Sequence, residues 1–545
     1  MAKKFSGKFW LALVIFSLTG QVAWVVENMY FNVFIYKMFH ADPTAISTVV
    51  AASATAAAVT TLLIGALSDR VGKRKIFIVA GYILWGISIL AFALIRVDVI
   101  GALFGNTVSA AALGVNLVIL MDCVMTFFGS SANDACFNAW LTESTDEGTR
   151  GKAEGINSMM PLVAILVVFG GFMGFDLDKA ESWTLIYIII GAVVLLIGVA
   201  GIFLIEDTTV ETGVNRNYFA NIFYGFRPSV IKGNGVLYMT LIAFMIFGIS
   251  IQTYMPYLIL YYTVSLKMEN YVMIMAPAII LASVATFFYG RLYDRFGFVK
   301  TVFPAVFILM GGYTLLYLFR DTPMVFLGSL LMMSGYLCGM AVFGAMVRDH
   351  TPENKTGMFQ GLRIFAQVLI PGITGPYIGA FVLSSAERVV NDDGTESFIP
   401  NENIYLAAFM VALLLMIFLY LVFLRRKETA AVKVVNDVQA DSMEALLQSG
   451  QPAQDVEKMM TSVIDGIVPA AAGKQAAAPE GAGRQDEFWD VLRDAEAAEA
   501  APAPERTAGQ VYEDRRDEDA WASGRPGDEA STEPVYYAES EGPED

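Results

Sequence analysis

A short charged turn between two long apolar runs occurs twice in this chain and constrains its fold more than any other feature. The first copy, residues 65–75, reads GALSDRVGKRK and lies between the apolar runs 44–67 and 76–95. The second copy, residues 290–300, reads GRLYDRFGFVK and begins 225 residues later. Because a loop this short makes its two helices antiparallel neighbours, the repetition predicts two similar halves, which in a membrane are typical of transporters.

The apolar runs are long enough to cross a bilayer. The chain has 545 residues, of which 56% are hydrophobic and 16% charged, an apolar share above that of ordinary soluble domains. Runs of about 20 apolar residues span roughly 30 Å of hydrocarbon. The predicted spans are residues 9–37, 44–67, 75–96, 114–143, 150–175, 183–205, 235–263, 270–290, 300–320, 323–348, 357–384 and 402–424.

A second repeated loop supports the division into halves. The pattern T-x-E-x-x-x-G-x-x-x-G occurs at residues 145–155 and again at 351–361, an offset of 206. The two offsets, 225 and 206, differ by 19, which is close to the length of a semi-apolar insertion at 97–113. We therefore predict an all-α membrane protein whose twelve helices form two six-helix bundles.

The predicted domains follow from composition. They are an N-terminal bundle at 1–205, a cytoplasmic linker at 206–234, a C-terminal bundle at 235–427 and an acidic, largely disordered cytoplasmic tail at 428–545. The tail has 27 acidic and 9 basic side chains and too little apolar surface to form a core. It is a solvated segment or, alternatively, it binds an unknown partner.

Basic residues predict the orientation. With both termini in the cytoplasm, 21 basic residues of the body fall on the cytoplasmic side and six on the opposite side. This asymmetry follows the positive-inside rule. The six are Lys37, Arg96, Lys179, Lys267, Arg320 and Arg388. We expect a multi-pass protein of the plasma membrane, with the lipid bilayer and a small molecule as partners, no nucleic acid partner, and a monomeric state.

Several classes of site are not indicated. The three cysteines, Cys123, Cys136 and Cys338, lie in apolar runs and are expected to be packed small hydrophobes. His40 and His350 have no second ligand nearby in sequence, so no metal site is expected. A phosphate-binding G-x-x-x-x-G-K-[ST] motif is absent. We therefore expect neither an enzyme nor a cofactor, only a coupling ion, H⁺ or Na⁺.

The two charged turns resemble the signature of the major facilitator superfamily, G-x-x-x-D-R-x-G-x-R-K. The first copy matches it fully, and the second has Val299 where a basic residue is expected. The matching residues are Gly65, Asp69, Arg70, Gly72, Arg74 and Lys75 in the first copy, and Gly290, Asp294, Arg295, Gly297 and Lys300 in the second. The resemblance covers residues 1–427 and implies two bundles that rock around a central cavity. More loosely, GQVAW at 20–24 looks like the sugar and glycoside–cation symporter branches.

The signature turns are candidates for a conformational latch. Gly65 is expected to permit close helix approach and Gly72 a tight turn. Asp69 is expected to meet a helix N-terminus or an arginine in only one arrangement of the two halves. The latch residues are Gly65, Asp69, Arg70, Gly72, Arg74, Gly290, Asp294, Arg295 and Gly297. The alternative is that these charges only set the topology.

Three acids fall well inside predicted spans: Glu27, Asp122 and Asp134. Charges within a membrane are costly and usually functional. Each could carry a coupling proton or bind sodium, or could be satisfied by neighbouring polar groups and only stabilise packing.

Polar residues accompany these acids at helical spacing. Gln21, Trp24, Asn28 and Asn32 are expected to share one face of the first span. Asn138 follows Asp134 by one turn, whereas Asn133 is expected on the side of Asp122. The predicted substrate-binding set is Gln21, Trp24, Asn28, Asn32, Asn133, Asn138, Asn157, Gln252, Tyr254 and Gln367. Amides, carboxylates and an indole suit a polyhydroxylated ligand.

The resulting expectation is a cation-coupled secondary transporter of a small polar solute, a sugar or glycoside, working by alternating access. Two rivals remain open. One is proton-coupled efflux of amphipathic drugs through a cavity lined by Met and Phe. The other is a non-transporting sensor that signals through its tail.

Overall fold

The computed structural model describes residues 7–104, 110–145, 147–207, 224–268, 270–351, 356–391 and 395–424. Most of the predicted linker and the whole predicted tail lie outside the described residues.

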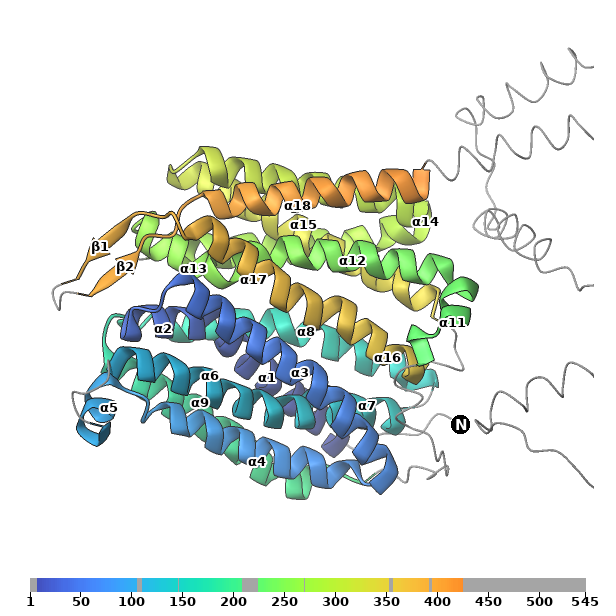
Figure 1. Cartoon of the computed structure of the whole chain (residues 1–545). Helices are drawn as coiled ribbons and strands as arrows, with labels where there is room; N and C mark the ends of the chain where they lie inside the picture. The colour runs from blue at the N-terminus through green and yellow to red at the C-terminus, as the bar shows by residue number, and fades with distance from the viewer. Residues whose placement is uncertain are drawn as a thin grey trace, which may run out of the picture. The chain divides into compact units, whose positions relative to one another are not determined.

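Figure 1 shows the described chain as two groups of long helices, one from each half of the sequence. The first group contains α1 (Gly7–Val25), α2 (Phe31–Phe39), α3 (Pro43–Val71), α4 (Arg74–Phe92), α5 (Val97–Phe104), α6 (Ala110–Gly129), α7 (Asn138–Ser144), α8 (Glu147–Phe172) and α9 (Ala180–Leu204). The second contains α11 (Pro228–Gly233), α12 (Gly235–Tyr254), α13 (Leu258–Leu260), α14 (Val272–Leu318), α15 (Thr322–Asp349), α16 (Thr356–Ile364), α17 (Ile370–Leu383) and α18 (Asn403–Leu419).

Several spans continue through a wider, π-helical turn or a short 3₁₀ turn. The π-helical turns are Val26–Tyr30 between α1 and α2, Ser130–Phe137 between α6 and α7, Tyr261–Ser265 after α13, Phe365–Leu369 between α16 and α17, and Tyr420–Leu424 after α18. The 3₁₀ turns are Tyr224–Phe226 before α11 and Met255–Tyr257 between α12 and α13.

Eleven described helical stretches are long and apolar enough to cross a membrane, and α14 supplies a twelfth pass. Gly297 interrupts α14 with φ 73° and ψ 176°. The Tyr289 hydroxyl donates to the carbonyl oxygen of Thr301 at 2.7 Å, twelve residues further on, whereas twelve residues of straight helix span about 18 Å. The chain therefore reverses at Gly297, and the twelve predicted spans agree with the structure.

A small hairpin was not expected from the sequence. Strand β1 (Arg388–Val390) pairs antiparallel with β2 (Glu396–Phe398) between the last two spans. The hairpin lies at one end of the helices, here called the hairpin end, and the turn between α3 and α4 lies at the other, the signature end (Figure 1). Apart from these two strands, the all-α prediction is confirmed within the described residues.

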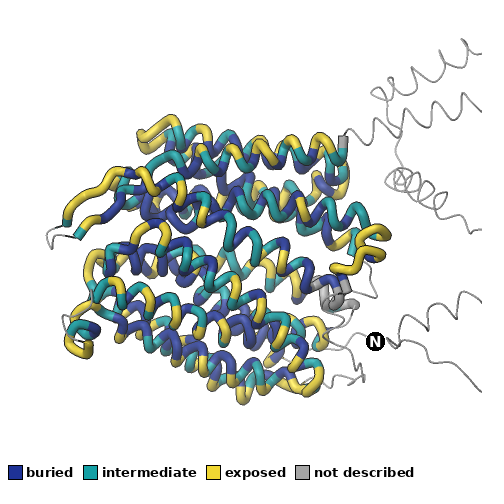
Figure 2. Tube along the Cα trace, viewed as in Figure 1, coloured by how far each residue is buried: buried dark blue, intermediate teal, exposed yellow. Residues whose placement is uncertain are grey.

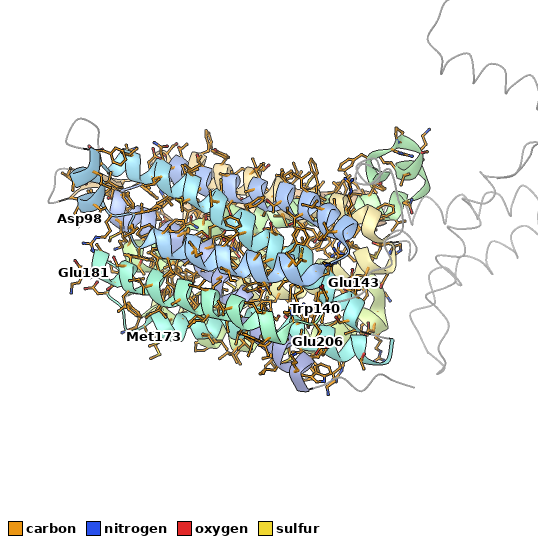
Figure 3. The ribbon with its side chains drawn as sticks, turned by 90° about the horizontal axis from the view of Figure 1, so that it is seen from below. Asp98, Trp140, Glu143, Met173, Glu181 and Glu206 are labelled. Atoms are coloured by element: carbon orange, nitrogen blue, oxygen red, sulfur yellow. The ribbon has the colours of Figure 1, made fainter. Side chains whose placement is uncertain are left out.

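The surface between the two ends is apolar, as a membrane requires. Phe203 is 71% exposed, Leu196 65% and Phe381 80%, and Figure 2 shows that exposed positions recur along the outward sides of the long helices. Labelled acids lie near the two ends of the first half: Asp98 and Glu181 at one, Glu143 and Glu206 at the other (Figure 3). Large exposed apolar side chains are unfavourable in water but suit a lipid environment.

The two halves are hydrogen-bonded to each other at the hairpin end. Ser47 on α3 contacts the Tyr257 hydroxyl at 2.7 Å and donates to the carbonyl oxygen of Pro376 at 2.7 Å. Further bonds join Tyr30 to Tyr271 at 2.8 Å, Tyr36 to the Phe398 carbonyl at 2.6 Å, and Thr48 to Tyr377 at 3.1 Å. These bonds, all buried except that between Thr48 and Tyr377, join the two halves at the hairpin end in this conformation.

The first signature turn is organised by Arg74. Its guanidinium, 3% exposed, donates to both oxygens of Glu143 at 2.6–3.2 Å. It also donates to Asp69 and to the Ser68 hydroxyl. All four residues belong to the first half, so the contacts of Asp69 described here do not bridge the halves. A latch between the halves stays a prediction.

The second signature turn replaces this ion pair with a neutral donor. Val299 stands where an arginine is expected, and the Tyr293 hydroxyl instead donates to Asp349 at 2.6 Å. Asp349 follows Glu143 by 206 residues, the offset of the second repeated loop. The charged residues Asp294 and Arg295 are exposed, as is Arg70 in the first turn, and the Arg295 guanidinium lies 5.2 Å from the centre of the Phe296 ring.

The signature glycines have different roles. Gly72 ends α3 with φ 68°, so the predicted tight turn is present. The expectation that Gly65 permits close helix approach is wrong in this conformation, because no described atom lies within 4 Å of a Cβ placed there. Gly290 is equally unobstructed. The left-handed positions Gly72 and Gly297 are thus the ones that require glycine.

Replacing Ser47 by Ala is expected to weaken the closure of the hairpin end. The substitution removes the hydroxyl that joins α3 to Tyr257 and Pro376, a loss of about 1–3 kcal/mol when buried partners lose a hydrogen bond. Spin labels at the exposed positions Thr44 and Val390 would report a larger population with a widened hairpin end. Thr61→Ala is the control, since among the described residues the Thr61 hydroxyl bonds only to the Ala57 carbonyl of its own helix; an equal shift in both variants would contradict this role.

Gly297→Ala is expected to lower thermal stability in detergent. Its backbone conformation is one that residues with a side chain adopt at a cost of about 1–3 kcal/mol. Gly290→Ala, seven residues earlier in helical conformation, should be neutral or stabilising by up to about 1 kcal/mol. Equal melting temperatures for the two variants would show that the reversal of α14 does not depend on Gly297.

Candidate functional site

Glu27 is buried within the first half, on the π-helical turn that joins α1 to α2. Its side chain is 6% exposed. Oε1 accepts hydrogen bonds from the Ser53 hydroxyl at 2.5 Å and the Thr126 hydroxyl at 3.0 Å. Oε2 has no hydrogen-bond partner among the described residues. The carboxyl is therefore half satisfied, which is unusual for a buried group.

Asp134 lies on a second π-helical turn, Ser130–Phe137. Its carboxylate accepts from the Ser130 hydroxyl at 3.0 Å and from the Asn133 amide at 3.2 Å. The Tyr82 hydroxyl donates to the Asn133 carbonyl oxygen at 3.0 Å and so fixes that amide. These bonds place Asn133 beside Asp134 rather than on the side of Asp122, and the prediction for Asn133 was wrong because the π-helical turn changes the helical register.

Asp122, on α6, is 1% exposed. Neither of its carboxyl oxygens has a hydrogen-bond partner among the described residues. Its charge interacts with that of Glu27, and the charge of Glu27 interacts with that of Asp134. Thr126, one turn after Asp122 on α6, binds Glu27 at 3.0 Å, so the structure places Glu27 and Asp122 in the same part of the first half.

The indole of Trp24 lies beside these acids. Its ring packs on Trp85 with centroids 5.1 Å apart. Its Nε1 is in electrostatic contact with the Asp134 carboxylate but does not meet hydrogen-bond geometry with any described atom. Trp24 is therefore partly covered, and a ligand that met it would also meet Asp134.

The amides near the acids are engaged mainly with their own helices. Asn28 donates to the Trp24 carbonyl at 2.8 Å, and Asn32 to the Asn28 carbonyl at 3.2 Å. Asn138 donates to the Asp134 carbonyl at 3.2 Å. Asn28 and Asn138 are exposed, whereas Asn32 is buried. The predicted common face of the first span is therefore divided between an exposed and a buried part.

The remaining candidates are dispersed. Asn157 on α8 accepts from the Ser17 hydroxyl at 2.5 Å. Gln21, Gln252 and Gln367 are half-buried, and the amide nitrogen of Gln367 has no partner among the described residues. Tyr254 belongs to the second half and does not join the acids.

The interior of the second half is aromatic. The Tyr254 ring lies 5.4 Å from that of Tyr313 and 5.8 Å from that of Tyr405. Tyr405 also contacts Tyr261 at 5.1 Å, and the hydroxyls of Tyr254 and Tyr405 have no partner among the described residues. The two halves therefore share a helical plan but differ in chemistry, because the first half has buried acids in addition to its own buried phenols.

Some residues of the site were not predicted. Ser53, Thr126 and Ser130 supply the hydroxyls that bind Glu27 and Asp134, and Tyr82 orients Asn133. Ser53 interrupts an alanine-rich run, which is a weak signal. Glu27, Asp134 and Gln367 lie on π-helical turns, which are frequent at functional sites. The spacing of residues in the sequence does not predict such turns.

The three acids are candidates for holding a coupling ion. In the part of the chain that the structure describes, no three His, Cys, Asp or Glu side chains converge as metal ligands would. Hard cations need several oxygen ligands, whereas Glu27 Oε2 and both Asp122 oxygens are without partners. A protonated carboxyl needs no counter-charge, so these acids can hold a proton in an apolar interior.

Comparison with known proteins agrees with the fold. The family model of the Major Facilitator Superfamily matches residues 9–286 and 271–459. A search of curated protein sequences finds no match.

Three solved structures show the same fold. A mutant of the nucleoside transporter NupG is 15% identical, with 76% of this chain and 99% of that chain covered and a TM-score of 0.59. The xylose transporter XylE from E. coli, in a partially occluded inward-open conformation, is 14% identical, with 76% and 99% covered and a TM-score of 0.56. A D-xylose–proton symporter is 13% identical, with 75% and 97% covered and a TM-score of 0.58.

The family model covers far more than half of the chain, and the twelve membrane passes, the duplicated signature turn and the neighbouring folds all agree with it. This chain belongs to the Major Facilitator Superfamily.

Proposed function

We propose that this chain is a secondary active transporter that couples the movement of a small polar solute, a sugar or glycoside, to that of protons. The observation that carries the proposal is the presence of Glu27, Asp122 and Asp134 inside one membrane-spanning bundle, the first two buried and the third half-buried. An ionised carboxylate there is costly, so each acid gains stability by holding a proton. Loss and gain of that proton can therefore be linked to a change of conformation.

The substrate class follows from the polar groups around these acids. Asn28 and Asn138 are exposed although they lie within long apolar spans. Polar side chains in a membrane protein face water or protein rather than lipid, which supports a wet cavity between the halves. Amides and the edge of an indole can donate to and accept from sugar hydroxyls. Nucleosides, which carry a ribose, share this chemistry, and the similar folds of a nucleoside transporter and xylose transporters support the same class.

Alternating access is supported by the hydrogen bonds at the hairpin end. The two halves meet there through pairs such as Ser47–Tyr257 and Tyr30–Tyr271. Such contacts can exist in one arrangement of the halves and break in another. We further propose that the protein works as a monomer in the plasma membrane with both termini in the cytoplasm, as the distribution of basic residues predicts.

Purified protein in proteoliposomes would test the proposal. Labelled xylose, sucrose, a β-glycoside and a nucleoside are offered under an inward pH gradient, an inward sodium gradient, or neither. Accumulation of one of these solutes with the pH gradient alone is the expected result. Accumulation with the sodium gradient alone would show that the coupling ion is sodium and not a proton. Extrusion of an amphipathic dye, with no uptake of any polar solute, would overturn the proposal in favour of drug efflux.

Glu27→Gln is expected to uncouple transport. The amide has the same shape and can accept from Ser53 and Thr126, but it cannot take up a proton. Solute should still equilibrate and exchange across the membrane, yet no longer accumulate above the external concentration. Glu154→Gln on α8, where the acid is exposed, is the control. Undiminished accumulation by Glu27→Gln would remove Glu27 from the coupling step.

Deleting residues 428–545 is expected to leave the rate and coupling of transport unchanged, because every residue of the proposed site lies before residue 425. Uptake by the shortened protein, normalised to the amount reconstituted, is the measurement. Full loss of uptake by a correctly folded shortened protein would show that transport requires the tail and would contradict this expectation.

A further inference from the structure

Arg363 lies on α16 and has no acidic partner among the described residues. Its side chain is half-buried, and its Nε nitrogen is buried without a hydrogen-bond partner in the part of the chain that the structure describes. A guanidinium is always charged and carries five N–H donors. Because buried charges are normally paired, an arginine in this state calls for an explanation.

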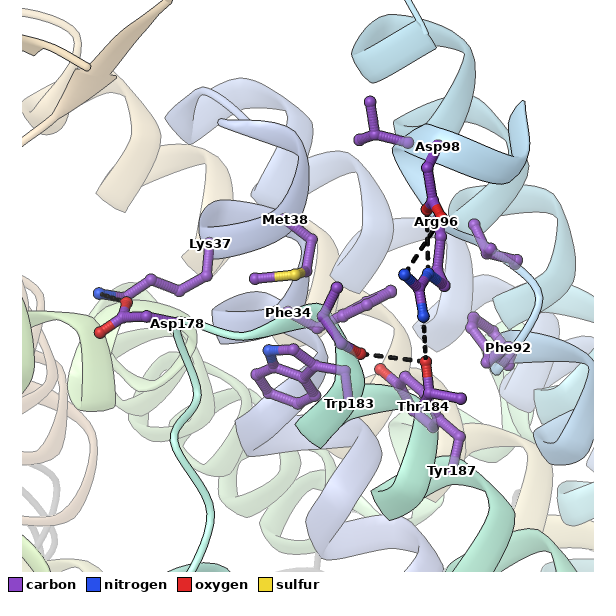
Figure 4. A pocket seen from close by; sticks show the side chains of 13 residues that line it. Phe34, Lys37, Met38, Phe92, Arg96, Asp98, Asp178, Trp183, Thr184 and Tyr187 are labelled. Carbon is purple, nitrogen blue, oxygen red and sulfur yellow. Dashed lines mark hydrogen bonds and ion pairs between the residues drawn. The ribbon is translucent and has the colours of Figure 1, made fainter. Parts of the chain in front are cut away.

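The other described arginines that are not exposed show the usual arrangement. Arg74 pairs with Glu143 at 2.6 Å. Arg96 lines a cavity of about 410 Å³ at the hairpin end, where it pairs with Asp98 at 2.9 Å (Figure 4). Among the arginines that the structure describes as buried or half-buried, Arg363 is therefore the one that lacks an acid.

Gln367 lies one helical turn after Arg363, on the π-helical turn Phe365–Leu369. Its side chain is also half-buried, and its amide nitrogen, Nε2, is buried without a partner among the described residues. Side chains four residues apart on a helix are neighbours, with about 5–6 Å between their Cβ atoms. The two residues therefore present one charged and one neutral donor, both unsatisfied, on the same face of one span.

This face of the span points toward protein and not toward lipid. Phe365 is 39% exposed and Val368 40% exposed, so these large apolar side chains mark the lipid-facing side. Arg363 and Gln367 each lie two residues from Phe365, and two residues turn a helix by about 200°. The π-helical turn contacts α3 of the first half and α12 of the second, so the two donors lie where the halves meet.

The two donors lie on the signature-end side of the contacts between the halves. Ser47 binds the carbonyl oxygen of Pro376 at the hairpin end, and Arg363 precedes Pro376 by thirteen residues, or about 20 Å of helix. Figure 1 shows α16 at the signature end of the described helices. Since both side chains are only half-buried, a small molecule that enters between the halves from the signature end can reach them.

We propose that Arg363 and Gln367 bind a carboxylate of the transported solute, which is therefore an acidic sugar such as a uronic acid or its glycoside. A guanidinium binds a carboxylate through two parallel N–H···O bonds, one of which can come from Nε. The amide of Gln367 supplies a further donor. The inference rests on the proposed function and narrows its substrate class.

The charge of Arg363 favours a carboxylate over a phosphate or a neutral group. A carboxylate carries one negative charge, which one guanidinium neutralises. A phosphate monoester carries about 1.5 to 2 negative charges at neutral pH, so an excess charge would remain inside the membrane, where charges are costly. A neutral sugar would leave the guanidinium without a counter-charge.

Isothermal titration calorimetry of the purified full-length chain in detergent tests the carboxylate without any transport. Methyl β-D-glucuronide is compared with methyl β-D-glucoside, and D-galacturonate with D-galactose; D-glucose 6-phosphate is the phosphate probe. At least one acid is expected to bind at least about tenfold more tightly than its neutral counterpart. Equal affinities within both pairs, no binding of either acid, or tighter binding of the phosphate would overturn the proposal.

Substitutions then locate the site. Arg363→Gln is expected to weaken binding of the acid at least about tenfold and that of the neutral sugar less than about threefold, because only the acid loses an ionic partner. Arg363→Lys keeps the charge but not the parallel donors, so its affinity should lie between those of Arg363→Gln and the parent. Gln367→Leu should weaken binding of the acid by about threefold or more. Equal losses for the acid and the neutral sugar would overturn the assignment.

Arg96→Gln is the matched control, since Arg96 is also half-buried but is already paired with Asp98. It should bind the acid like the parent, and a loss equal to that of Arg363→Gln would overturn the assignment. Unchanged melting temperatures without ligand confirm that the variants are folded. A parent protein that binds the acid but moves no solute would refute the proposed function alone, whereas one that accumulates neutral sugars and binds no acid would refute only this inference.

Discussion

The free energy needed to hold a carboxyl group in a dry interior governs the first half of this protein. Glu27 obtains two hydroxyl donors, from Ser53 and Thr126, but only at one of its two oxygens. Asp122 obtains none from the described residues. Hydrogen bonds to every carboxyl oxygen of these acids would stabilise the fold but would fix their protonation state. Incomplete hydrogen bonding leaves them able to exchange protons, which is the physical basis of the proton coupling proposed above.

The second half has a similar arrangement of helices but does not contain the buried acids of the first half. Tyr254, Tyr313 and Tyr405 pack ring to ring in its interior. At the signature turns there is a similar contrast, because Arg74 binds Glu143 through charge while Tyr293 binds Asp349 through a neutral hydroxyl. The first half also has an aromatic interior, for example around Tyr187, so the buried acids are what distinguish it.

The sequence predicted the features that depend on chain length and periodicity. The twelve passes, the reversal at Gly297 and the turn at Gly72 follow from apolar runs and from glycine at fixed spacing. The three buried acids were found because charges are rare within apolar runs. Their partners were not, since hydroxyl residues are common in membrane helices and no pattern shows which of them face Glu27. The π-helical turns moved Asn133 toward Asp134, and a helix read at 3.6 residues per turn does not reveal that shift. For Gly65 the sequence predicted a contact that is not there, because its place in the motif suggested a close helix approach that this conformation lacks.

The reversal of α14 at a single glycine has a mechanical consequence. With no loop between residues 296 and 298, the two limbs of α14 have no slack, and the Tyr289–Thr301 hydrogen bond ties them together close to the bend. We expect a displacement of one limb to reach the other through this hydrogen bond and through the backbone at Gly297.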